Sequence, residues 1–132
     1  MKYWLILGVM VIGLVGCGSK SGAAIPAPQT RTVDGFAISL TSQAKAEINT
    51  AQQWIVTIVD ANGQPVSGAD VFLDLVMPSM VMGQNKPLAT DNGDGTYTAE
   101  GLYSMGGKWQ VAVHASIDDT DHIAVFEITV PE

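Results

Sequence analysis

Soft ligand side chains are concentrated in one short stretch of this sequence. The segment VMPSMVMG, residues 76–83, holds three methionines within six residues, Met77, Met80 and Met82. A fourth methionine, Met105, precedes two glycines between predicted strands. Thioethers are neutral, soft ligands that suit copper(I) and suit zinc, calcium or magnesium poorly. The candidate chemistry is therefore Cu(I) binding by methionine.

The same methionines have a second interpretation. Methionine is a flexible side chain that fills gaps in cores and forms adaptable apolar contact surfaces. Under this interpretation Met77 ends a core strand, and the others cover the open end of the domain or contact a partner. Core methionines should be scattered among buried strand positions, whereas none of these four lies in the middle of a predicted strand. Both interpretations stay open, with Met80 and Met82 the preferred ligands.

Two histidines form a secondary candidate site. His114 ends one predicted strand and His122 begins the next, with Asp118, Asp119 and Asp121 between them. We therefore expect both histidines near one loop, at the end of the domain opposite the methionines. Such a corner can bind Zn or Cu(II). The spacing matches no established motif, and solvated loop residues are the commoner explanation.

Arrangements typical of enzymes are missing from the sequence. It has no nucleophile elbow, no phosphate-binding glycine loop and no acid pair whose placement can be argued. Ser116 shares a strand face with His114, but no third group orients them. The DNGDG stretch, residues 91–95, lacks the twelve-residue pattern of a calcium loop and is predicted to be a turn. We expect a binding protein and not an enzyme.

The N-terminal residues are organised like a secretory signal. Lys2 is followed by an apolar run that is too short to span a bilayer, which takes about 20 residues, and small residues lead to Cys17. The sequence Leu-Val-Gly-Cys at 14–17 resembles the lipobox of bacterial lipoproteins, in which the cysteine is lipidated. The resemblance implies a signal peptide over residues 1–16. It also implies a Cys17 that carries palmitate or similar chains and anchors the protein to a membrane, extracytoplasmically or in the periplasm.

Charge and cysteine content exclude several functions. Without residues 1–16 the chain has five basic and thirteen acidic residues, a net charge of −8. An acidic surface disfavours nucleic acid and anionic lipid headgroups and is compatible with cations or basic partners. Because Cys17 is the only cysteine, no thiol remains for a disulfide, a thiolate metal site or a nucleophile. Stability must come from the core.

The rest of the chain predicts a tether followed by one domain. Residues 17–34 comprise the lipidated cysteine and a flexible tether that is rich in Gly, Ala, Ser and Pro. Over residues 35–132 short β-rich runs alternate with turn signals, which predicts an all-β immunoglobulin-like sandwich of about seven strands without a disulfide. The predicted strands are 36–41 and 45–48, which together form one broken edge strand, then 54–60, 69–77, 87–90, 95–102, 109–116 and 122–130.

The predicted topology brings the methionines toward one another. Alternate loops of a Greek-key sandwich meet at the same pole, so we expect Met105 to share a pole with the loop that holds Met77, Met80 and Met82. Met80 and Met82 face one way if their segment is extended. Pro78 favours an extended conformation for the residue before it.

Four motifs in a fixed order point to a family. They are W-x-V-T-I-x-D-A-x-G-x-P-V-x-G-A-x-V, then M-P-x-M-x-M, D-N-G-D-G-T-Y-T-A and M-G-G-K-W-x-V-x-V, and they span residues 54–113. In this order they resemble the YtkA-like family of small extracytoplasmic domains. The resemblance implies a β-sandwich at the outer side of a membrane, a link to copper handling and respiratory copper-enzyme assembly, and methionines of the MPxM element as suspected ligands.

A more distant likeness is to the CopC-type periplasmic copper carriers, which are also sandwiches with a methionine-rich loop. Those proteins use an N-terminal histidine for copper(II), whereas here the mature N-terminus is an acylated cysteine, so that site is not carried over. The expected function is Cu(I) binding or transfer next to a bilayer, with a membrane-associated copper enzyme or copper chaperone as partner and no nucleic acid. The alternative is a non-metal interaction or structural module of the cell envelope.

Overall fold

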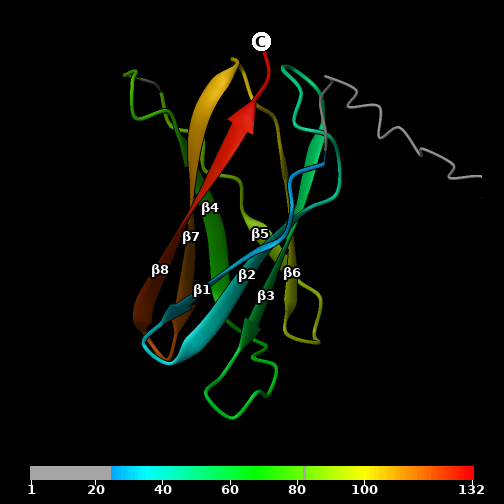
Figure 1. The fold of residues 1–132 in the computed structure, drawn as a ribbon. Helices are drawn as coiled ribbons and strands as arrows, with labels where there is room; N and C mark the ends of the chain where they lie inside the picture. Colours follow the sequence, from blue (N-terminus) through cyan, green and yellow to red (C-terminus); the bar gives the residue numbers. More distant parts are fainter. Residues whose placement is uncertain (1–24, 82) are drawn as a thin grey trace, which may run out of the picture.

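The structure is a computed structural model that describes residues 25–81 and 83–132. The expected signal peptide, Cys17 and Met82 lie outside the described residues. The described residues form eight strands, and all eight belong to one domain (Figure 1). The strands are β1 Gln29–Val33, β2 Phe36–Ser42, β3 Gln52–Val59, β4 Asp70–Val76, β5 Ala89–Asp91, β6 Thr96–Gly101, β7 Gly107–Ile117 and β8 Thr120–Val130. In this part of the chain no helix long and apolar enough to cross a membrane is found.

The strands pack as two antiparallel sheets. One sheet has the order β1-β2-β3-β6-β5 and the other the order β4-β7-β8. Apart from the additional edge strand β1, this is the division of strands found in constant-type immunoglobulin domains. The predicted all-β sandwich without a disulfide is confirmed.

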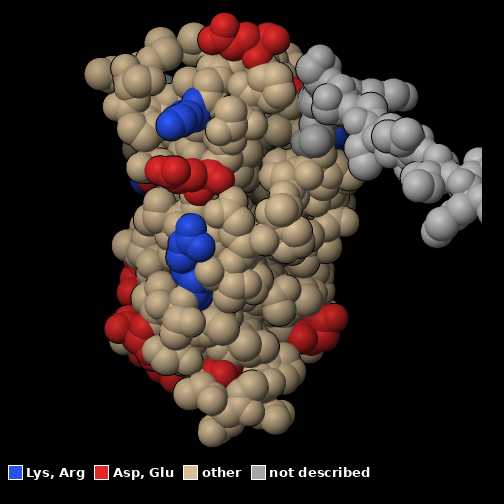
Figure 2. All heavy atoms as spheres, viewed as in Figure 1, with Lys and Arg blue, Asp and Glu red and all other residues tan. Residues whose placement is uncertain are grey.

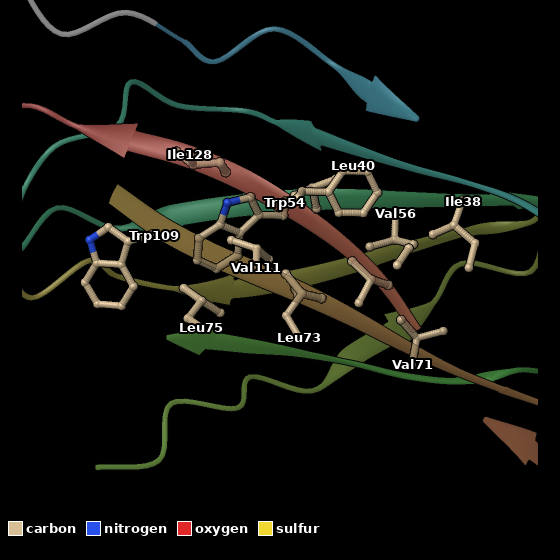
Figure 3. Packing of buried hydrophobic residues seen from close by; sticks show 14 of the residues in the cluster. Ile38, Leu40, Trp54, Val56, Val71, Leu73, Leu75, Trp109, Val111 and Ile128 are labelled. Carbon is tan, nitrogen blue, oxygen red and sulfur yellow. The ribbon is translucent and has the colours of Figure 1, made fainter. Parts of the chain in front are cut away.

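Alternating side chains from both sheets fill the space between them. Inward-facing residues of β3, β4 and β7 are buried at every second position, as the sequence pattern predicts (Figure 3). The largest buried side chains include Trp54, Trp109, Tyr97, Tyr103 and Phe126. Burial of such side chains contributes about 1.5–3 kcal/mol each, so the core replaces the stabilisation that a disulfide supplies in related sandwiches.

An aromatic cluster bridges the two sheets near one end. The ring centroid of Tyr103 lies 5.7 Å from that of Trp54 on β3 and 5.4 Å from that of Trp109 on β7. These two strands carry the intersheet disulfide in antibody domains. Tilted and edge-on aromatic contacts at such distances add to the stabilisation from area burial. The cluster therefore ties the sheets together where a disulfide would.

The two ends of the sandwich have different residues. We call one end the acidic pole; it carries the β1–β2, β3–β4, β5–β6 and β7–β8 turns. We call the other the methionine pole; it carries the β2–β3, β4–β5 and β6–β7 loops and the last residues of the chain. Met77 and Met105 belong to loops of the same pole, as the Greek-key argument predicts.

The structure corrects two expectations about the first strands. Residues 29–33, expected in the flexible tether, form β1 and pair with β2 throughout. Residues 45–48, expected as half of a broken edge strand, form no strand, and only Ile48 makes an isolated bridge, to Tyr103. The strand β1 was missed because its residues are mostly exposed, so they show no alternation of apolar and polar side chains.

Candidate functional site

Met77 is part of the core and not of the accessible surface. It follows the last residue of β4 and is only 5% exposed. Its Cε atom lies against the backbone of Gly107, where an added Cβ would come within 2.9 Å of it. Gly107 has a φ of +122°, so both conformation and space favour glycine at this position. Among the predicted ligands, Met77 is therefore the one whose side chain is packed in the core.

The segment after Met77 turns back on itself. The backbone N–H of Met80 donates to the carbonyl of Met77 at 3.1 Å, which closes a four-residue turn with Pro78 in its second position, where proline is favoured. The extended conformation was expected for Met77 and for residues 80–82, so this turn between Met77 and Met80 is a feature that the sequence pattern did not predict. The turn separates them, because one side chain points into the core and the other toward solvent.

Met80 and Met105 remain accessible at adjacent ends of neighbouring strands. Met80 is 47% exposed and Met105 is 41% exposed. The end of β4 leads into the loop with Met80, and the start of its antiparallel neighbour β7 follows the loop with Met105. The third predicted ligand of this loop, Met82, lies outside the described residues. Two thioethers are therefore available to solvent at one pole.

The backbone around Met105 is held by the core. The buried indole of Trp109 donates from Nε1 to the carbonyl oxygen of Met105 at 2.9 Å. Trp109 contacts Tyr103, whose hydroxyl accepts a hydrogen bond from Trp54 Nε1 at 3.3 Å. Burial raises the pKa of Tyr103 to about 12, so this hydroxyl stays neutral over the physiological range. The exposed Met105 side chain thus projects from an anchored backbone.

A shallow hollow lies beside the turn, on the outer side of the three-stranded sheet. Its volume is about 400 Å³. Pro78 and Ser79 form one wall, and Lys108, Gln110 and Glu127 contribute to the others. Its walls carry a positive charge, a negative charge and apolar surface. The hollow could not be predicted from the sequence because its residues come from three separate segments.

The two histidines do not come together. Antiparallel pairing sets His122 opposite Ala115 and His114 opposite Ile123, so the histidines project from opposite faces of the sheet. Both lie toward the acidic pole, as predicted, but the shared Zn or Cu(II) corner is not formed. The two histidines were expected to be close because both lie near the same loop. Side chains alternate between the two faces of a strand, however, and this alternation separates them.

Each histidine instead has a structural partner. His114 Nδ1 lies 3.0 Å from an oxygen of Asp121, and its ring stacks on Phe72 at 4.4 Å. His122 is buried, and its Nδ1 lies 2.8 Å from an oxygen of Asp34 in the β1–β2 turn. Within residues 25–81 and 83–132, no group of three or more His, Cys, Asp or Glu side chains is arranged to hold a metal ion.

Two exposed apolar side chains at the methionine pole were not predicted from the sequence. Val81 is fully exposed at the tip of its loop, and Leu102 is 43% exposed just after β6. The signal that could have found them is the presence of unpatterned apolar residues in loops, where polar residues are usual. Together with Met80 and Met105 they give this pole four exposed apolar side chains.

Fold and site define a small immunoglobulin-like sandwich with accessible thioethers and exposed apolar side chains at one pole. Comparison with protein families gives a match to the YtkA-like family over residues 30–114, more than half of the chain. The chain belongs to the YtkA-like family. The match includes Met77, Met80 and Met105 and ends at His114. Among curated proteins, the comparison finds none that matches this chain.

Proposed function

We propose that this protein is a membrane-anchored extracytoplasmic domain that binds Cu(I) through thioethers of the methionine pole. Its role is then to receive the ion from, or pass it to, a membrane-associated copper enzyme or copper chaperone. Membership in the YtkA-like family suggests an extracytoplasmic domain, and the lipobox-like sequence before Cys17 supports the anchor. The proposed role is binding and transfer, without catalysis.

One observation carries the copper proposal. Met80 and Met105 stay about half exposed on loops at one pole, whereas Met77 of the same segment is buried. Met80 and Met105 are therefore available as ligands, whereas Met77 is packed in the core. The donor set fits the ion, because neutral thioether sulfurs are soft ligands that suit Cu(I). Met82 adds a further thioether within the same loop.

The ligand set also supports transfer over storage. Thioethers hold Cu(I) without thiolate, and the only cysteine is Cys17, assigned here to the lipid. A site made of neutral side chains at a surface can release its ion to a thiolate or imidazole site of a partner. The backbone anchor from Trp109 to Met105 keeps one ligand in place while the ion is exchanged.

A Cu(I) competition titration against a chromogenic chelator under reducing conditions tests the proposal. The full chain is compared with Met80→Leu, Met105→Leu and the matched control Met77→Leu, which keep the apolar bulk. We expect stoichiometric binding that each of the first two changes weakens about tenfold or more, a loss of about 1.4 kcal/mol. The control should bind like the parent protein. Binding that none of the leucines alters would exclude the proposed ligands.

The exposed apolar residues favour one alternative. Val81 and Leu102 have no role as copper ligands, yet they are exposed on loops of the same pole as Met80 and Met105. The methionine pole can therefore serve as a docking surface of a non-metal interaction or structural module. Such a surface would tolerate leucine in place of methionine. The same leucine variants thus distinguish the two functions, because only copper binding requires sulfur.

A further inference from the structure

The chain enters the sandwich from the side of the methionine pole. The side chain of Gln29, the first residue of β1, donates to the backbone carbonyl of Glu127 at 2.9 Å. Glu127 pairs with Gln110, which pairs with Val76 at the end of β4. From this level β1 runs toward the acidic pole. Figure 1 shows residues 25–28, the described residues before β1, on the same half of the molecule as the C-terminus.

The chain before β1 is short compared with the domain. Strand β7 has 11 residues and runs between the two poles, a length of about 36 Å at 3.3 Å per residue. Eight residue steps separate Cys17 from Ile25, and covalent geometry limits them to at most about 29 Å. The tether therefore holds the anchor within about 29 Å of Ile25, which favours contact of the membrane with the methionine half.

Charge is distributed unevenly along the same axis. Eight aspartates lie in or next to the turns of the acidic pole, with no described lysine or arginine among them: Asp34, Asp60, Asp70, Asp91, Asp94, Asp118, Asp119 and Asp121. The methionine half carries all three described lysines, Lys45, Lys86 and Lys108, together with four glutamates, Glu47, Glu100, Glu127 and Glu132. Its net charge is therefore much closer to zero than that of the acidic pole. On the face seen in Figure 2 the lower end shows acidic side chains and no basic ones. An anionic bilayer surface repels the acidic pole.

The methionine pole has the side chains of an interfacial contact. Val81 is fully exposed, and Met80, Leu102 and Met105 are each more than 40% exposed. Exposed apolar side chains can enter the interfacial layer of a bilayer, and this pole carries less negative charge to oppose that contact than the acidic pole does. Lys108 borders the hollow beside the turn, at the level where headgroups would lie.

We infer that the methionine pole rests on the lipid surface of the membrane that holds the anchor, with the acidic pole turned outward. The inference depends on the proposed lipidation of Cys17 and deepens the proposed function. It brings the thioethers to the depth of the bilayer interface. A partner that exchanges Cu(I) with them is then embedded in that membrane and presents its own site at the interface.

Depth-dependent quenching tests this orientation. The full acylated chain carries one new cysteine for an environment-sensitive fluorophore, either Ser104→Cys at the methionine pole or Asn62→Cys at the acidic pole. Both sites are exposed loop positions. The protein is reconstituted into phosphatidylethanolamine and phosphatidylglycerol vesicles with nitroxide-labelled headgroups. We expect loss of emission from the label at 104 and retained emission from the label at 62. Equal quenching, stronger quenching at 62, or no quenching at either site would overturn the inference.

Two sets of variants separate this inference from copper binding. Val81→Asp combined with Leu102→Asp should abolish quenching at position 104 and leave the Cu(I) titration unchanged. Met80→Leu combined with Met105→Leu should do the opposite, because leucine keeps apolar contact and lacks sulfur. Persistent quenching in the aspartate variant would contradict a lipid contact. Mass spectrometry of the purified chain checks the acyl groups, and their absence would refute the anchor and with it the orientation, whatever the copper result.

Discussion

At the scale of single residues, burial divides the methionines into two kinds. Met77 is almost fully buried and contacts Gly107, whereas Met80 and Met105 are accessible. Of the two interpretations that the sequence left open for Met77, its burial directly after β4 fits the one in which it belongs to the core. The sequence cannot predict the turn that follows, because that turn depends on the hydrogen bond between Met80 and Met77. The same residue type thus serves stability at one position and is available for binding at the others.

Stability measurements should reproduce this division. We expect Met77→Ala to lower the free energy of unfolding by about 2–5 kcal/mol, since it leaves a cavity in the core. Met77→Leu should cost less than about 1.5 kcal/mol because it conserves volume. Met80→Ala should stay within about 0.5 kcal/mol of the parent protein, as surface changes usually do. Denaturant unfolding followed by tryptophan fluorescence measures all three. Equal losses for the alanine variants at 77 and 80 would refute the assignment.

Tyr103 predicts how stability depends on alkaline pH. Its pKa is raised by burial to about 12, above the value of about 10 in an unfolded chain. The folded state therefore holds the phenolic proton more tightly. The resulting stabilisation is fully present below pH about 10 and is lost as the pH rises toward about 12.

The variant Tyr103→Phe tests this contribution. At neutral pH we expect a loss of about 1–3 kcal/mol, because the buried Trp54 Nε1 loses its acceptor. Between pH 10 and 12 the variant should lose less further stability than the parent, since phenylalanine does not titrate. Urea unfolding across this pH range gives both results. Parallel pH profiles would show that Tyr103 ionises as freely in the folded protein as in the unfolded one.

At the scale of elements, most strands follow from the sequence and β1 does not. Alternating burial in β3, β4, β7 and β8 matches the predicted pattern within one or two residues at each end. Strand β1 is an edge strand with little buried side-chain surface, so periodicity cannot find it. The better signal is the Asp34-Gly35 pair, both residues with positive φ, because such pairs favour two-residue hairpin loops. Turn chemistry therefore predicts this hairpin where hydrophobic pattern fails.

The β5–β6 turn allows a matched test of packing between turns. Gly93 and Gly95 both have positive φ, of 84° and 86°. An added Cβ meets nothing within 4 Å at Gly93, but at Gly95 it would lie 2.5 Å from Cβ of Pro65 in the β3–β4 loop. Both Gly93→Ala and Gly95→Ala should lose about 1 kcal/mol from backbone strain. Gly95→Ala should lose a further 1 kcal/mol or more, about the cost of overpacking.

Thermal unfolding of the two glycine variants measures this difference. The contact with Pro65 joins the β5–β6 turn to the β3–β4 loop at the acidic pole. It is supported by a hydrogen bond from the Ile58 N–H to the Gly95 carbonyl at 2.9 Å. Equal midpoints for the two variants would mean that the turns do not pack against each other.

At the scale of the whole molecule, the order of strands in the two sheets determines which candidate residues share a pole, and this part of the site could be predicted from the sequence. The common pole of Met80 and Met105 follows from the Greek-key order, without knowledge of any side chain. The histidine pair fails because strand pairing puts His114 and His122 on opposite faces of their sheet. Contacts that depend on topology could thus be predicted, whereas contacts that depend on register and loop conformation could not.

The two ends of the whole molecule also differ: one carries the thioethers and a mixture of lysines and glutamates, and the other carries aspartates without lysine or arginine. Copper binding at the methionine pole is the central claim, and NMR of the full chain labelled with [methyl-¹³C]methionine tests it most directly. During Cu(I) titration we predict that the Met80 and Met105 methyl resonances shift and saturate together at one equivalent, while that of buried Met77 stays in place. Methyl resonances of Met80 and Met105 that do not change, with copper in excess, would contradict a thioether site and leave this pole as a contact surface.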